Sequence, residues 1–334
     1  MTAVTDTGHT PLAPAARTTR AWRVIGRYGS LGMLGILVAI VAALAPTTFA
    51  TSDNVINILN QSALSAVIAM GLTFALVTGE FDLSIGNIAG LSGVLACKLI
   101  VDAGASIPAA FAVAVGVGAA IGLLNGFIVT VLNVNALVAT LGVGTMAVGV
   151  NYAVADGRPV GLKDPDDFLA ISLGRFLGIP YPVWIMIVLA AVLWLLLNRT
   201  VLGQSMQAVG GNPVAARLSG IRVERVRVVG FMICGTLAGL TGVLLATRTA
   251  GASVSAGDSY LLSAFAAAFF GSAVLRDGQF HIVGTLVGVI TVAVGFNAIA
   301  LIGMETYWQY LFQGLLLIIG VGVGTVARRK TAGA

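Results

Sequence analysis

Charged residues are scarce in this chain. Its 334 residues include 18 Lys+Arg and 13 Asp+Glu, which together make up 9% of the sequence, whereas soluble globular domains carry about 25%. A chain with so few charges cannot cover its surface with groups that water solvates, so a soluble globular protein is excluded. Hydrophobic residues make up 58%. The composition therefore indicates a polytopic membrane protein, with room for roughly ten or eleven spans of about 20 apolar residues each.

Lysine, cysteine and histidine are also rare. None of the lysines (Lys98, Lys163 and Lys330) follows a glycine, so the G-x-x-x-x-G-K-S/T phosphate-binding loop is absent, and with it ATP hydrolysis by that route. The cysteines, Cys97 and Cys234, lie far apart within apolar runs, which favours two core residues over a disulfide. No cluster of metal ligands appears. We therefore expect no catalytic residue, metal or cofactor in this chain.

Ten apolar stretches follow one another and predict an all-α polytopic membrane protein with about ten transmembrane helices. They cover residues 31–50, 55–78, 84–101, 109–132, 136–155, 183–198, 228–247, 261–275, 281–302 and 306–326. We expect a polar N-terminal tail at 1–30, a membrane domain at 31–326 and a C-terminal tail at 327–334. The polar leader is too long for the charged region of a secretory signal, so the first stretch is expected to remain as a span.

The basic residues predict the orientation of these spans. An even number of spans places both termini on one side, and 13 of the 18 basic residues fall in the tails and connections of that side. By the positive-inside rule, both termini are cytoplasmic. The basic connection 199–227 lies on this side, and a connection of that length is more often functional than not. The acidic, proline-rich connection 156–182 is expected outside, as an ordered loop or a short helix.

Glycines recur four positions apart within the spans and so share one helix face. The sets are Gly86/Gly90, Gly118/Gly122/Gly126, Gly235/Gly239, Gly284/Gly288 and Gly320/Gly324. In lipid, small residues at this spacing let helix backbones approach closely. They predict a compact helix bundle.

Two segments interrupt the apolar pattern. In the first, residues 78–86, Glu80 and Asp82 lie between two apolar runs. A carboxylate at bilayer depth costs about 2.5–3.5 kcal/mol on insertion scales, so both are expected to face a cavity or a partner. Asp82 either caps the helix that starts near Ser84 or acts on substrate or gating. The second segment, 271–281, predicts an exposed turn, although His281 would also suit a proton-coupled step.

Polar side chains within the spans form the remaining candidates for a solute path. Asn57, Asn60 and Gln61 are three and four positions apart, hence on one helix face. They either bond across helices or line a path for a hydroxyl-rich solute. The full set of path candidates is Asn57, Asn60, Gln61, Glu80, Phe81, Asp82, Ser84 and Asn87.

A short helix is predicted inside the basic connection. Asn212 is suited to the N-cap, Pro213 to the first helical position and Gly220 to the stop. The helix has eight residues or fewer and lies between two spans, outside the membrane. Such an element needs a partner surface.

These segments together resemble a known family. The Gly-Asn-Pro helix (210–221), the Gly-x-Phe-Asp-Leu-Ser-Ile-Gly stretch (79–86), Gly-Arg-Pro-Val (157–160) and Gly-Thr-Leu-Val-Gly (284–288) look like the permease subunits of ABC importers of the ribose and simple-sugar type. The resemblance covers about residues 55–326. It implies a type II importer-like permease that carries a monosaccharide or related polyol across the bacterial cytoplasmic membrane.

The resemblance also implies partners. It predicts a second permease chain in a homodimer, a cytoplasmic ATPase that binds ATP and Mg²⁺, and a sugar-binding protein outside. The segment 210–221 matches the family's coupling helix, which docks in the ATPase. That role falls on Gly210, Gly211, Asn212, Pro213, Ala215, Ala216, Arg217, Ser219 and Gly220.

The chain also departs from the commoner pattern of the family. Glu80 stands where a second glycine is frequent, and residues 276–281 replace a glycine-rich turn, so no particular sugar is assigned. An ion-coupled secondary sugar transporter remains an alternative, with Glu80, Asp82 and His281 as its titratable candidates. A channel or structural membrane protein is a third class.

Overall fold

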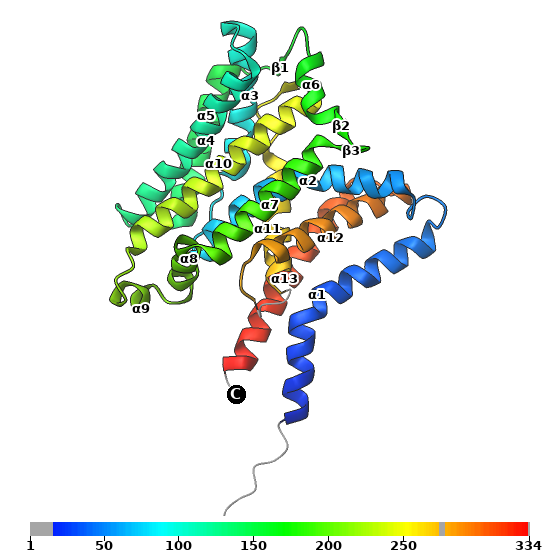
Figure 1. Ribbon diagram of the computed structural model, residues 1–334, viewed down its shortest axis with the longest axis vertical. Helices are drawn as coiled ribbons and strands as arrows, with labels where there is room; N and C mark the ends of the chain where they lie inside the picture. Colours follow the sequence, from blue (N-terminus) through cyan, green and yellow to red (C-terminus); the bar gives the residue numbers. More distant parts are fainter. Residues whose placement is uncertain (1–15, 274–277, 333–334) are drawn as a thin grey trace, which may run out of the picture.

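The computed structural model describes residues 16–273 and 278–332, and they are mainly helical (Figure 1). Arg276 and Asp277 of the predicted turn lie outside the described residues. The helices are α1 (Ala16–Leu44), α2 (Ser52–Val77), α3 (Ile85–Ala103), α4 (Ile107–Thr130), α5 (Ala136–Ala155), α6 (Asp166–Leu173), α7 (Tyr181–Arg199), α8 (Val201–Gly211), α9 (Pro213–Leu218), α10 (Val223–Thr249), α11 (Asp258–Ser272), α12 (Ile282–Leu301) and α13 (Tyr307–Ala332).

Every predicted span overlaps a helix. Among the described residues, seven helices are long and apolar enough to cross a membrane, namely α2, α3, α4, α5, α7, α10 and α12. The helices α1 and α13 contain shorter apolar stretches, Leu31–Leu44 and Tyr307–Gly322, and α11 has 15 residues. The chain is therefore a multi-pass membrane protein, whereas ten crossings stay a prediction. The predicted tails are partly helical, since α1 begins at Ala16 and α13 runs to Ala332.

The described residues are mostly helical, as predicted, and short strands add to the helices. Two antiparallel ladders of two residues each occur: β1 (Val160–Gly161) pairs with β4 (Gly251–Ala252), and β2 (Arg175–Phe176) with β3 (Ile179–Pro180). Strands this short contain no alternating pattern that a sequence could reveal. The β1–β4 ladder joins the acidic connection to the segment after α10. The acidic connection also contains α6, which agrees with the prediction of an ordered loop or a short helix there.

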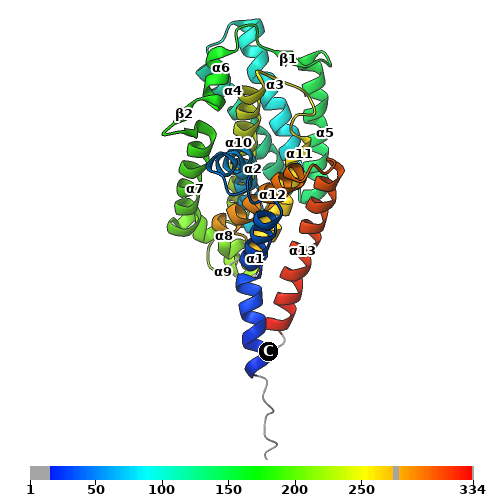
Figure 2. The same cartoon turned by 90° about the vertical axis from the view of Figure 1, so that its right-hand side faces the viewer.

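The bundle has two opposite ends, and different elements lie at each (Figures 1 and 2). The start of α1, the end of α13, and α8 with α9 lie at one end, called the α9 end below. The acidic connection with β1 and α6 lies at the other, the α6 end. Both described chain ends thus lie at the same end of the bundle as the basic connection (Figure 1). Which end faces the cytoplasm stays a prediction.

The core is built around α2 and α10. From Ala66 to Thr78, every residue of α2 and its C-cap is buried, and α10 packs against α2, α3 and α4. Cys97 and Cys234 are both buried and unpaired by disulfide, which confirms their assignment to the core.

The glycine pattern explains how α4 and α10 approach. A Cβ atom built on Gly118 would lie 2.5 Å from the Gly235 carbonyl oxygen, and one on Gly122 would lie 2.3 Å from the Phe231 carbonyl oxygen. Carbon atoms cannot come this close to backbone oxygens, so only glycine permits the observed helix contact. The prediction of close helix packing is confirmed for this pair.

Replacing Gly122 by alanine is therefore expected to lower the free energy of unfolding by about 1–3 kcal/mol, because the methyl group forces two backbones apart. Gly116 lies on the same helix with no atom within 4 Å of its added Cβ. Alanine at Gly116 should instead be neutral or raise stability by up to about 1 kcal/mol, since alanine favours the helix. Thermal unfolding of the detergent-purified variants measures both shifts. Equal shifts of the midpoint would contradict the packing argument.

Candidate functional site

The segment between α2 and α3, residues 78–84, is called the first break. The α2 helix ends at Val77 with Thr78 as its C-cap, and Gly79 turns the chain with φ +88°. Asp82 and Ser84 are fully buried, and the Leu83 N–H donates to Thr140 Oγ1 at 3.0 Å. Thr140 is the fifth residue of α5, so the first break lies about one helical turn inside the bundle. An irregular backbone at this depth is tolerated only where protein or a cavity surrounds it.

Asp82 anchors the start of α3. Its Oδ1 atom accepts hydrogen bonds from the Ser84 N–H at 2.9 Å and the Ser84 hydroxyl at 2.5 Å. The Ser84 hydroxyl in turn accepts from Asn125 Nδ2 of α4 at 2.8 Å. Ser84 is the N-cap residue of α3, so Asp82 binds the cap residue rather than the first helical turn. The structure thus gives Asp82 the helix-start contact that was one of its two interpretations.

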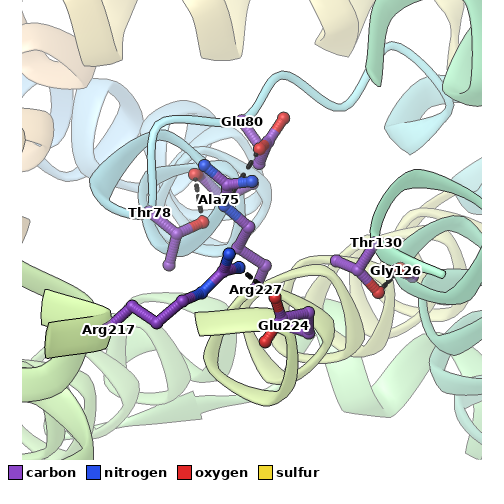
Figure 3. A network of polar contacts seen from close by, with 8 residues as sticks. All are labelled: Ala75, Thr78, Glu80, Gly126, Thr130, Arg217, Glu224 and Arg227. Carbon is purple, nitrogen blue, oxygen red and sulfur yellow. Dashed lines mark hydrogen bonds and ion pairs between the residues drawn. The ribbon is translucent and has the colours of Figure 1, made fainter. Parts of the chain in front are cut away.

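Glu80 faces a cation. Its Oε1 atom lies 3.1 Å from Nε of Arg227 on α10, and the side chains are 13% and 28% exposed. The Nε atom has no aligned hydrogen bond among the described residues, so the contact is electrostatic. A second ion pair joins Arg217 of α9 to Glu224 of α10 (Figure 3). Glu80 therefore has the charged partner that its depth requires.

Four phenylalanines, called the phenylalanine cluster, connect the first break with residues 278–281, which are the described end of the second interrupted segment and are called the second break. Phe81 stacks on Phe265 and Phe269 of α11, with ring centroids 6.3 and 6.2 Å apart. Phe280 of the second break meets Phe269 edge-on at 5.2 Å. The two breaks, about 200 residues apart in sequence, therefore share one aromatic contact.

His281 closes the second break. Its Nδ1 atom accepts the Gly284 N–H at 3.0 Å, and the residue is the N-cap of α12. The side chain is buried. A neutral imidazole with an acceptor Nδ1 suits this contact, because a doubly protonated ring has no acceptor.

An open pocket of about 560 Å³ lies between the two breaks and the end of α8. It is lined by Leu76, Val77, Gly79, Phe81, Gln207, Gly210, Gly211, Gln279 and Phe280. Its volume falls in the usual range of small-molecule sites. The amides of Gln207 and Gln279 can donate and accept hydrogen bonds, while the two rings offer apolar faces. The pocket suits a small solute with both hydroxyl and C–H surfaces.

The remaining path candidates lie elsewhere. Gln61 Nε2 donates to Asn57 Oδ1 at 3.1 Å, which confirms that these two share a face, and Asn60 is partly buried beside them. Gln61 also lines a small pocket of about 80 Å³ with Ser62, Ser65 and Ser263. The rise of the helix places Gln61 about 24 Å from Val77.

The structure therefore separates the path candidates into two groups. Glu80, Phe81, Asp82 and Ser84 meet at the first break. Asn57, Asn60 and Gln61 lie toward the other end of α2. Asn87 lies one turn further along α3 and adjoins the first break, because a Cβ on Gly144 of α5 would meet both the Asn87 amide at 2.7 Å and the Ser84 Cα at 3.2 Å.

The predicted short helix in the basic connection is confirmed as α9. Asn212 Oδ1 accepts the N–H groups of Val214 and Ala215 at 3.1 and 3.0 Å, and Gly220 ends the helix with φ +85°. Val214 and Leu218 are 69% and 85% exposed. A helix that presents apolar side chains outside the spans offers a surface for a partner.

The helix before α9 was not predicted. Val201–Gly211 forms α8, whose N-cap Thr200 accepts the Gly203 N–H at 3.1 Å. Three glycines weaken its helical propensity, but buried Met206 and Val209 hold it to the core. Gly210 lies directly against α2, since a Cβ there would be 1.8 Å from the Val77 carbonyl oxygen. The connection 199–227 is thus mostly helical rather than a loop.

The sequence analysis did not single out several residues that the structure brings to the site. Arg227 was counted only as a basic residue, and Asn125 lay unnoticed within an apolar run, although an amide in a span is itself a signal. Phe265, Phe269 and Phe280 resemble ordinary core residues, and no local pattern distinguishes them.

Comparison with known proteins identifies related chains. A family model described as "Branched-chain amino acid transport system / permease component" matches residues 54–321. The ribose import permease protein RbsC of Escherichia coli (strain K12) is 36% identical over 277 residues, covering 82% of this chain and 86% of the relative. RbsC of Bacillus subtilis (strain 168) is 36% identical over 280 residues, with 84% and 86% covered.

The L-arabinose ABC transporter permease protein AraH of Azospirillum brasilense is 34% identical over 273 residues, with 82% of this chain and 80% of the relative covered. No solved structure matches the chain. The family model spans well over half of the sequence. The chain therefore belongs to the family of permease components described for branched-chain amino acid transport systems.

Proposed function

We propose that this chain is the permease subunit of an ATP-driven ABC importer that carries a monosaccharide or related polyol across the bacterial cytoplasmic membrane. The observation that carries the proposal is α9, a short capped helix outside the spans with Val214 and Leu218 exposed. The names of the ribose and arabinose relatives support the class of solute. ATP hydrolysis belongs to a separate ATPase, and this chain is not an enzyme.

The proposal includes the assembly and its orientation. The α9 end faces the cytoplasm, where α9 is the coupling helix and the partner ATPase holds ATP and Mg²⁺. A sugar-binding protein delivers the solute at the α6 end, and a second copy of the chain completes the permease. The helices α1, α11 and α13 complete ten crossings. The basic residues of the connection 199–227 support this orientation.

The solute path joins the polar residues near the start of α2 to the pocket beside the first break. Asn57, Asn60 and Gln61 serve its outer part, and the 560 Å³ pocket serves its inner part. The phenylalanine cluster borders that pocket through Phe81 and Phe280. Opening this cluster would admit the solute to the pocket, which makes it the gate of the inner part.

An ion-coupled mechanism is disfavoured by the same contacts. It needs a titratable group within the spans that is free to exchange protons or bind a cation. Glu80 is paired with Arg227, Asp82 binds the cap of α3, and His281 caps α12. Each candidate group already has a structural partner.

Reconstitution tests the proposal. The chain is purified with the ATPase that co-purifies with it, placed in liposomes, and supplied with its binding protein and radiolabelled D-ribose or L-arabinose. Accumulation is expected with ATP and Mg²⁺ on the ATPase side and not without them. Accumulation by this chain alone under an imposed proton or sodium gradient would contradict the proposal.

A further inference from the structure

Two ion pairs lie in series between α9 and the first break (Figure 3). Arg217 of α9 pairs with Glu224 in the first turn of α10. Three residues further along α10, Arg227 pairs with Glu80 of the first break. The start of α10 is thus held by one ion pair to α9 and by another to the first break.

The two pairs differ in exposure, and so in what they can do. Arg217 and Glu224 are 65% and 48% exposed, and exposed ion pairs contribute little to stability. This outer pair can break and reform at low cost. Arg227 and Glu80 are 28% and 13% exposed, so removing either partner leaves a charge shielded from water. The inner pair therefore resists separation of the first break from α10.

The two pairs lie on one unbroken stretch of α10. Val223 and Val226 are buried on its inner face, and continuous helical hydrogen bonds join Glu224 to Arg227. A displacement of Glu224 therefore displaces Arg227 with it. Glu80 is drawn along through its contact with Arg227, and the bonds from the Gly79 and Glu80 N–H groups to the carbonyls of Leu76 and Ala75 join the first break to the end of α2.

We infer that Arg217, Glu224, Arg227 and Glu80 form an ion-pair linkage that couples the position of α9 to the conformation of the first break. All four are positioning residues for transport, and none of them touches the solute in this role. The inference rests on the proposed function, in that a partner ATPase moves α9. It adds the route by which that movement reaches Phe81 and the phenylalanine cluster, next to Glu80.

The transport test compares sugar uptake per ATP hydrolysed in the reconstituted complex. Glu80→Gln and Arg227→Gln are each expected to lower this ratio about fivefold or more, while ATP hydrolysis continues. Exchanging the charges, Glu80→Arg with Arg227→Glu in one chain, should restore most of it. Arg225→Gln is the matched control, since Arg225 is exposed on the same helix turn. Unchanged single variants, or an exchange that restores nothing, would overturn the inference.

A second measurement needs no transport. Hydrogen exchange, followed by mass spectrometry on the detergent-purified chain, reports the amides of residues 78–84. Arg217→Gln should speed their exchange several-fold although it lies on α9, and Arg225→Gln should not. Equal exchange in both variants would overturn the linkage. Uptake by this chain alone under an imposed ion gradient, without ATP, would instead refute the proposed function, and hydrogen exchange then decides the linkage separately.

Discussion

Replacing Gly210 by alanine is expected to abolish uptake and to lower the yield of folded protein. A Cβ atom at this position would lie 1.8 Å from the Val77 carbonyl oxygen, and backbone cannot yield as a flexible side chain does. Overpacking of this kind costs about 1–3 kcal/mol or more. The strain falls where α8 meets the end of α2, next to the first break. Uptake in reconstituted vesicles and thermal unfolding in detergent measure the two effects.

Gly211 is the matched control for this substitution. It is the next residue along α8, yet no atom lies within 4 Å of its added Cβ. Gly211→Ala should therefore leave the unfolding temperature near that of the wild type. If it still impairs uptake, the loss comes from docking of the ATPase or from the pocket that Gly211 also lines, and ATP hydrolysis by the complex distinguishes the two. If Gly210→Ala were as stable and active as Gly211→Ala, the contact between α8 and α2 would be wrong.

Replacing Asp82 by alanine is expected to have a comparably large effect. The Ser84 N–H and hydroxyl would lose their common acceptor at a fully buried place. An unsatisfied buried polar group costs about 1–3 kcal/mol. The start of α3 should loosen, with loss of thermal stability and of uptake. Thermal unfolding and uptake of the purified variant test this result.

Asp82→Asn separates the two interpretations of this residue. Asparagine keeps an acceptor oxygen for Ser84 but has no charge. If Asp82 anchors α3, this variant should keep most of the stability and uptake that alanine loses. If the charge itself acts on the solute or on a proton, Asp82→Asn should fail in uptake while staying folded. Glu305→Ala, at an exposed acidic residue before α13, serves as the control for loss of an acidic side chain.

The sequence predicted α9 and the first break correctly, because the residues that specify each of them lie within a few positions of one another. Asn212, Pro213 and Gly220 stand within nine positions of one another and specify the start and end of α9. Glu80 and Asp82 interrupt an apolar run, which suffices to predict the first break. In both cases the physical cause, a capping bond or the cost of a charge in lipid, acts within a few residues.

The partners of these elements could not be predicted in the same way. Arg227 lies 147 positions after Glu80, and nothing near either residue encodes their meeting. The same holds for Phe81 and Phe269, which meet only because α11 packs beside the first break. The helix α8 was missed because its glycines oppose helix formation locally, while burial of Met206 stabilises it through distant contacts. Tertiary packing decided each of these outcomes.

The length of α2 has a mechanical consequence. Its 26 residues make a rod of about 39 Å, with Asn57 near one end and Val77, which abuts Gly210, at the other. A helix is stiff along its axis, so an axial shift imposed at Val77 arrives at Asn57 undiminished. In the proposed path, the residues near Asn57 and the pocket beside Val77 would therefore be displaced together, because both adjoin the same helix.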